Sequence, residues 1–93
     1  MGASSSSEAT PEAAKFVDDA VNSKQVVVFS KTYCPYCTRA KKELQRQGAS
    51  DMLVVELDKR GDGGAIQSAL QAKTGQRTVP NVFINQEHVG GCT

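Results

Sequence analysis

Two cysteines separated by two residues are the groups in this sequence best suited to chemistry. The segment Cys34-Pro35-Tyr36-Cys37 lies between a run typical of a buried strand and a stretch typical of an amphipathic helix. At the start of a helix, residues i and i+3 share one face with Cβ atoms about 5–6 Å apart, which is close to disulfide geometry. The spacing therefore predicts a redox-active pair of thiols.

The two sulfurs are expected to have different roles. Cys34 falls at the predicted N-cap, where a thiolate accepts backbone N–H groups and is stabilised by the helix dipole. Pro35 fits the first helical position, and Lys31 places a cation three residues before Cys34. Because such surroundings lower a thiol pKa from about 8.5 to roughly 3.5–7.5, we expect Cys34 to be the attacking nucleophile. Cys37, one turn into the helix, is expected to be the buried resolving thiol.

A packing role and a zinc site are the alternatives to a redox pair. Packing gives no reason for a Lys-x-x-Cys-Pro-x-Cys arrangement at the start of a helix. Cys34 and Cys37 with His88 and Cys92 form a ligand set of the zinc type, but zinc sites normally hold Cys-x-x-Cys in a tight turn. We therefore expect no metal and an exposed strand position for His88. Cys92 is expected either to fill space or to be open to glutathionylation or an intermolecular disulfide.

The apolar periodicity predicts an α/β domain with the element order α-β-α-β-α-β-β. The expected elements are a helix capped by Thr10, a strand over 25–30, a helix over 35–47, a strand over 52–57, a helix over 65–73, and a hairpin of strands 81–84 and 88–89. The unbroken apolar run in the first strand indicates burial on both faces. Segment 58–64 is rich in glycine and is predicted to be an irregular loop.

Composition excludes several broad classes of protein. The chain has 93 residues, 11 Lys and Arg against 10 Asp and Glu, and a net charge of +1, which disfavours an electrostatic nucleic-acid binder. The longest strongly apolar run, 26–29, is far shorter than the roughly 20 residues of a membrane span. Three cysteines are too few for a disulfide-stapled secreted scaffold, so we expect a reducing, cytoplasmic location.

The first nine residues differ in composition from the rest of the chain. Residues 1–9 are polar and of low complexity, so we expect a disordered tail followed by one domain over 10–93. Gly2 with Ser6 fits the pattern for N-myristoylation. Contact with a membrane is expected only if Gly2 is acylated, and a single acyl chain anchors marginally.

Three segments, 27–37, 74–84 and Gly90-Gly91-Cys92, resemble the dithiol glutaredoxins in order and spacing. The resemblance implies a thioredoxin-like fold, with a central mixed four-stranded sheet and helices on both faces. Glutaredoxins continue past the Gly-Gly-Cys motif into a final helix, whereas this sequence ends at Thr93. We therefore expect the final C-terminal helix to be missing and one face of the sheet to lack its cover.

The resemblance also implies an activity and a binding site. The expected enzyme is a glutathione-disulfide oxidoreductase that reduces protein disulfides and protein–glutathione mixed disulfides, with glutathione as the reductant. The resemblance places a cis Pro80 beside the nucleophile. It also places Lys31, Gln67 and Arg77 at the glycine carboxylate of glutathione, and the three C-terminal residues at its γ-glutamyl group. The full set implied for glutathione is Lys31, Cys34, Tyr36, Gln67, Arg77, Thr78, Val79, Pro80, Gly91, Cys92 and Thr93.

An iron–sulfur carrier is the alternative function, because some relatives hold a cluster between two subunits through the first cysteine and glutathione. Pro35 and Tyr36 make the turn stiffer and bulkier than the glycine-containing versions that favour clusters. The expected partners are glutathione and glutathionylated or disulfide-bonded proteins. A monomer is expected, with a dimer only through a cluster or through Cys92.

Overall fold

A mixed four-stranded sheet with the order β2-β1-β3-β4 forms the centre of the computed structural model, which describes residues 9–91. β1 (Val26–Ser30) pairs in parallel with β2 (Met52–Glu56) and antiparallel with β3 (Asn81–Ile84). β4 (Glu87–Gly90) completes the sheet antiparallel to β3. The fold is the thioredoxin-like arrangement that the resemblance implies.

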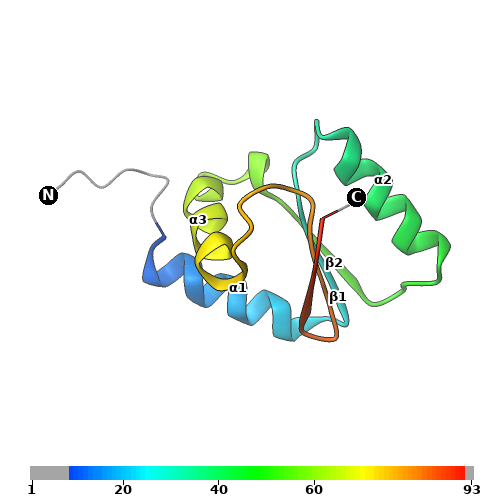
Figure 1. The fold of residues 1–93 in the computed structure, drawn as a ribbon, viewed down its shortest axis with the longest axis horizontal. Helices are drawn as coiled ribbons and strands as arrows, with labels where there is room; N and C mark the ends of the chain where they lie inside the picture. Colours follow the sequence, from blue (N-terminus) through cyan, green and yellow to red (C-terminus); the bar gives the residue numbers. More distant parts are fainter. Residues whose placement is uncertain (1–8, 92–93) are drawn as a thin grey trace, which may run out of the picture.

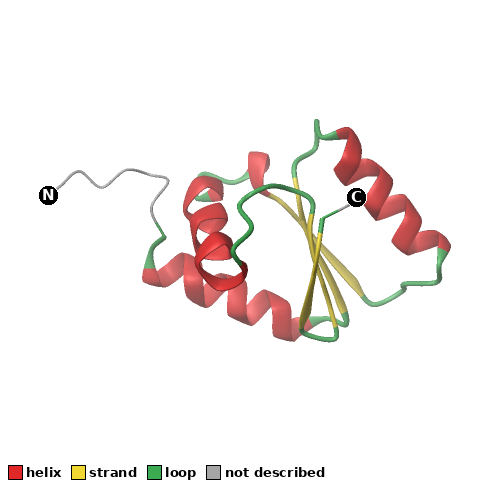
Figure 2. Cartoon of the chain, viewed as in Figure 1, coloured by secondary structure: helices red, strands yellow, loops and turns green. Residues whose placement is uncertain are grey.

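Helices cover the two faces of this sheet unequally. α1 (Pro11–Ser23) and α3 (Gly63–Thr74) pack on one face, and α2 (Pro35–Arg46) lies on the other (Figures 1 and 2). α1 begins as predicted, because Thr10 Oγ1 accepts a hydrogen bond from the Ala13 N–H at 3.0 Å. No helix within residues 9–91 has both the length and the apolar character needed to cross a membrane.

The larger core lies between the sheet and the α1–α3 layer. Val27, Phe29 and Phe83 of the sheet are buried there against α1 and α3, and the rings of Phe29 and Phe83 meet edge to face with centroids 6.0 Å apart. Val28 faces α2 and belongs to a smaller cluster with Val82. The first strand is therefore buried on both faces, as its unbroken apolar run predicts.

The prediction of an irregular loop over 58–64 is wrong at both ends. A short 3₁₀ helix, η1 (Leu57–Lys59), follows β2, and α3 begins at Gly63 rather than at Ala65. A Cβ atom on Gly63 would lie 2.2 Å from the carbonyl oxygen of Leu57. Gly63 is therefore needed for close packing against η1 and does not indicate irregular backbone.

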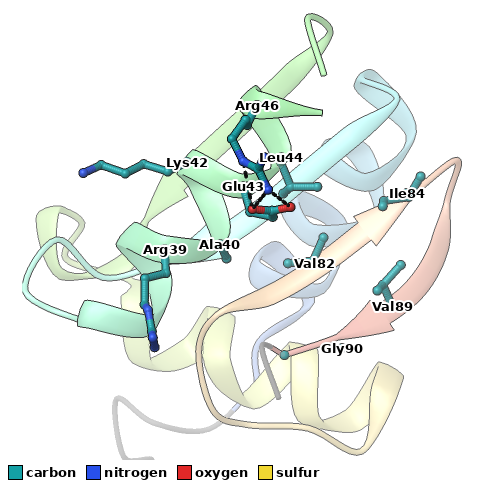
Figure 3. Close-up of a pocket in the computed structure, with 11 residues that line it drawn as sticks. Arg39, Ala40, Lys42, Glu43, Leu44, Arg46, Val82, Ile84, Val89 and Gly90 are labelled. Carbon is teal, nitrogen blue, oxygen red and sulfur yellow. Dashed lines mark hydrogen bonds and ion pairs between the residues drawn. The ribbon is translucent and has the colours of Figure 1, made fainter. Parts of the chain in front are cut away.

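An open groove of about 540 Å³ separates α2 from the β3–β4 hairpin (Figure 3). Leu44, Val82, Ile84 and Val89 contribute apolar side chains to it, and Val89 is 59% exposed. No helix follows β4 within the described residues 9–91. The groove lies on the face of the sheet that is predicted to lack its cover.

Candidate active site

Cys34 occupies the N-cap of α2, as predicted. Its backbone is extended, with φ −87° and ψ 117°, and Pro35 is the first helical residue. The Cys37 backbone N–H donates to Cys34 Sγ across 3.3 Å, and the Cys34 N–H donates to the Lys31 carbonyl at 3.1 Å. The strand-to-helix turn thus fixes Cys34 where the first turn of α2 can solvate a negative sulfur.

The two thiols have pKa values that move in opposite directions. Partial burial opposes ionisation of Cys34, but hydrogen bonds from the Cys37 side chain and from the backbone N–H groups of Cys37 and Tyr36, together with the charge of Lys41, outweigh it. The pKa of Cys34 is therefore lowered. Burial and the neighbouring Cys34 sulfur raise the pKa of Cys37. A lowered pKa provides the thiolate that attacks disulfides, and a raised one keeps the partner protonated.

Access from solvent differs between the sulfurs in the same sense. Cys37 is fully buried, whereas Cys34 is partly exposed beside two tyrosines that are themselves 70% and 57% exposed, Tyr33 and Tyr36. The Arg39 guanidinium lies 5.8 Å from the centre of the Tyr36 ring. A substrate sulfur can therefore reach Cys34 from solvent. The buried Cys37 can react with a disulfide that has first formed on Cys34.

The loop before β3 approaches the same end of the sheet. Asn81 at the start of β3 is the register partner of Phe29 near the end of β1, so Val79 and Pro80 lie at the end of the sheet from which the Cys34 turn emerges. The Val79–Pro80 peptide bond is cis, as the resemblance implies. A Cβ atom on Gly91 would lie 3.2 Å from the Pro80 carbonyl oxygen, which places the end of the described chain against this loop.

Gln67 and Arg77 are brought together by α3 and this loop. Gln67 Nε2 donates to the Arg77 carbonyl at 3.0 Å, and Arg77 Nη1 donates to Ser68 Oγ at 2.8 Å. Thr78 is exposed between them and the cis bond, and Lys31 is half-buried in the β1–α2 loop. Cys92 and Thr93 fall outside the described residues, so their predicted contact with glutathione stays a prediction.

His88 is exposed, as predicted, and its ring lies 5.3 Å from that of Phe83 at a tilt of 50°. No group of three or more His, Cys, Asp or Glu side chains among residues 9–91 is arranged to hold a metal ion. The suggested zinc set includes Cys92, which lies outside this range.

Two features of the site were missed by the sequence analysis. Gln76 Nε2 donates to the carbonyl oxygens of Thr78 and Pro80, at 3.0 Å each, and so holds both sides of the cis bond. The second is an ion pair in which Lys41 Nζ lies 2.6 Å from Glu56 Oε2. A polar residue between a helix end and a proline was the available signal for Gln76; nothing local to the sequence marked Glu56.

The model of the glutaredoxin family matches residues 26–89. This chain belongs to the glutaredoxin family. Over 72 residues, it is 64% identical to glutaredoxin-C2 of Arabidopsis thaliana, a match that covers 77% of this chain and 64% of that protein. It is equally similar to a glutaredoxin of Ricinus communis, over 77% of this chain and 70% of the relative. The two cysteines in Cys34-Pro35-Tyr36-Cys37 place it in the dithiol class.

Solved glutaredoxin structures agree with the fold. A buckwheat glutaredoxin–glutathione complex superposes with a TM-score of 0.83 at 52% identity, over 89% of this chain and 78% of that chain. A wheat glutaredoxin gives a TM-score of 0.85 at 52% identity, over 92% of this chain and 79% of that one. The chain spans 64% of the Arabidopsis thaliana relative's length and as little as 53% of the length of another matched relative.

Proposed function

We propose that this dithiol glutaredoxin is a glutathione-dependent oxidoreductase that reduces protein–glutathione mixed disulfides and protein disulfides. The observation that carries the proposal is the asymmetry of the two thiols. Cys34 is accessible, sits at the N-cap of α2 and has a lowered pKa, whereas Cys37 is buried with a raised pKa. This is the arrangement that a nucleophile and a resolving thiol require.

Glutathione is proposed as the reductant, on the support of the similar buckwheat protein that was solved as a glutathione complex. The backbone of Val79 would pair with the tripeptide as a short added strand. Lys31, Gln67 and Arg77 would meet its glycine carboxylate, and residues 91–93 would meet its γ-glutamyl end. Tyr36 would flank the glutathione sulfur and Thr78 would contact its backbone.

The proposed cycle for a mixed disulfide has two exchange steps. The Cys34 thiolate attacks the glutathione sulfur, forms a Cys34–glutathione disulfide and expels the protein sulfur as a thiolate, which takes up a proton from water. A second glutathione thiolate then attacks the glutathione sulfur bound to Cys34. That step releases oxidised glutathione and restores the Cys34 thiolate, so the two electrons come from the two glutathione molecules.

Protein disulfides would follow a second branch through Cys37. The Cys34 thiolate first attacks one sulfur of the substrate disulfide, which forms a Cys34–substrate mixed disulfide and expels the other substrate sulfur as a thiolate. Cys37 then loses its proton to water and attacks Cys34 Sγ, which forms the Cys34–Cys37 disulfide and expels the second substrate sulfur; both expelled thiolates take up protons from water. Two glutathione molecules later reduce the Cys34–Cys37 disulfide and leave as oxidised glutathione. The 3.3 Å hydrogen bond between the Cys37 N–H and Cys34 Sγ supports this branch, because it holds the two residues in one turn.

The test is glutathione-coupled reduction of a small mixed disulfide by the wild type, Cys34→Ser and Cys37→Ser. The two variants carry the same chemical change one helical turn apart, so each is the control for the other. We expect Cys34→Ser to abolish turnover and Cys37→Ser to retain it for the glutathione mixed disulfide. Equal losses in both variants, or activity in Cys34→Ser, would refute the proposed roles.

A further inference from the structure

A polar cluster, made of Ser30, Cys37, Lys41 and Glu56, lies between α2 and the sheet. Along α2, Lys41 follows Cys37 by four residues and Cys34 by seven, so these side chains share one face of the helix. On the sheet, Ser30 and Glu56 are register partners at the ends of β1 and β2. They follow Val28 and Val54 by two residues each, and both valines belong to the α2-facing cluster.

The charged pair in this cluster is largely removed from water. Lys41 Nζ and Glu56 Oε2 are 2.6 Å apart, and the two side chains are only 22% and 23% exposed. The second carboxylate oxygen, Glu56 Oε1, is buried and has no hydrogen-bond partner among the described residues. Ion pairs exposed at the surface are screened by solvent, whereas charges in such a half-buried position act on their neighbours through a lower dielectric.

An unpartnered carboxylate oxygen is costly to bury, so packing alone gives no reason for this pair. The position of the Lys41–Glu56 pair does give a reason, because Lys41 lies one helical turn from Cys37 on the same face of α2. We propose that Lys41 is a positioning residue for the Cys34 thiolate, and that Glu56 sets how much of the Lys41 charge reaches the two sulfurs. The proposal rests on the proposed function only in taking Cys34 as the nucleophile.

The other charged groups near Cys34 either contact different residues or lie in the loop between β1 and α2. Asp58 on η1 accepts hydrogen bonds from the Thr32 backbone and hydroxyl, and Arg39 lies over the Tyr36 ring. Lys31 stands in the β1–α2 loop with no ion pair among the described residues. The charge of Lys41 is one of the causes that lower the pKa of Cys34.

The proposal predicts changes of opposite sign from the two halves of one ion pair. Removing the cation in Lys41→Met raises the pKa of Cys34, because the thiolate loses a favourable charge. Neutralising the anion in Glu56→Gln keeps the shape of the side chain and leaves Lys41 without its counter-charge, so the pKa of Cys34 falls further. If the ion pair had only a structural role, both substitutions would shift the pKa of Cys34 in the same direction.

The experiment measures the rate at which iodoacetamide alkylates Cys34 in the reduced protein across a range of pH. Fragmentation of the peptide over residues 32–39 by tandem mass spectrometry shows whether Cys34 or Cys37 carries the label. The matched control is Lys42→Met, since Lys42 is the exposed neighbour of Lys41 and forms no ion pair among residues 9–91. Thermal unfolding of each variant shows that the fold is retained.

We expect the midpoint of the Lys41→Met profile to move upward, with a rate below the midpoint that is about 3- to 10-fold lower than in the wild type. The Glu56→Gln midpoint moves downward, and the Lys42→Met profile stays unchanged. Shifts in the same direction for both members of the pair, or shifts no larger than that of Lys42→Met, would overturn the proposal.

If Lys41→Met does not fold, Lys41→Arg and Glu56→Gln decide the question. Lys41→Arg keeps the cation and must behave as the wild type, while Glu56→Gln must still lower the midpoint. Alkylation requires no glutathione, so a protein that fails the turnover assay can still pass or fail this test. The proposed function and the role of the Lys41–Glu56 pair can thus fail separately.

Discussion

Gln76→Ala is the substitution that best separates the support of the active site from its chemistry. The Gln76 side-chain amide donates to the carbonyl oxygens of Thr78 and Pro80, at 3.0 Å each, one before Val79 and one after Pro80. Alanine removes both donors and leaves the backbone of the loop otherwise intact. We expect the loop to lose its fixed position while Cys34, at the N-cap of α2, keeps its own hydrogen bonds.

The expected magnitude follows from the two hydrogen bonds. A neutral hydrogen bond contributes about 0.5–1.5 kcal/mol, and more when its partner is left buried without a replacement. The bond to Thr78 is exposed, so water can replace it, whereas the bond to Pro80 is partly buried. We therefore expect a loss of about 1–2 kcal/mol in the free energy of unfolding. For a domain of this size, that lowers Tm by roughly 5–15 °C.

The assays are thermal unfolding and the dependence of turnover on glutathione concentration. The matched control is Gln71→Ala, because Gln71 is exposed on α3 and its side chain has no hydrogen bond among the described residues. If Val79 pairs with glutathione as proposed, Gln76→Ala raises KM for glutathione several-fold and changes kcat little. Gln76→Glu keeps the shape without the donors and is expected to be no better than alanine. The reasoning is refuted if Gln76→Ala and Gln71→Ala have the same Tm and the same KM.

Two further predictions concern the segment around η1. Gly63→Ala places a Cβ atom 2.2 Å from the Leu57 carbonyl oxygen, so we expect denaturant unfolding to show a loss of about 1–3 kcal/mol. Gly61→Ala is the control, with nothing within 4 Å of its Cβ, and equal stabilities of the two variants would contradict the packing argument. Hydrogen bonds from Thr32 lower the pKa of Asp58, so the stabilisation is present above the usual carboxyl pKa of about 3.9 and is lost as the pH falls through the lower folded value. Asp58→Asn should therefore have a lower Tm than the wild type at neutral pH, and the difference in Tm between the two proteins should become smaller in acid. A difference in Tm that does not depend on pH would count against this role for Asp58.

Local patterns in the sequence were sufficient to predict the elements that hold Cys34. The run 26–29 predicted a central strand, and Cys34 followed by Pro35 predicted an N-cap and a first helical residue. Both features depend on the intrinsic geometry of a strand and a helix start, so they need no knowledge of distant residues.

Contacts between distant segments could not be predicted in the same way. Lys41 and Glu56 meet because β2 pairs with β1 in one register, which fixes the face from which Glu56 emerges. The start of α3 at Gly63 could not be predicted, because the close approach of Gly63 to Leu57 exists only in the folded chain. Gln76 is likewise an ordinary polar residue until the loop before β3 brings two carbonyl oxygens to its amide.

The ionisation of Cys34 in the wild-type protein tests the central claim most directly. The measurement is the pH dependence of alkylation of the fully reduced protein, with the modified cysteine identified by mass spectrometry at each pH. We predict that Cys34 reacts first, with a midpoint below the value of about 8.5 for a free cysteine, while Cys37 stays protected. A Cys34 midpoint at or above that of free cysteine, or earlier modification of Cys37, would contradict the account.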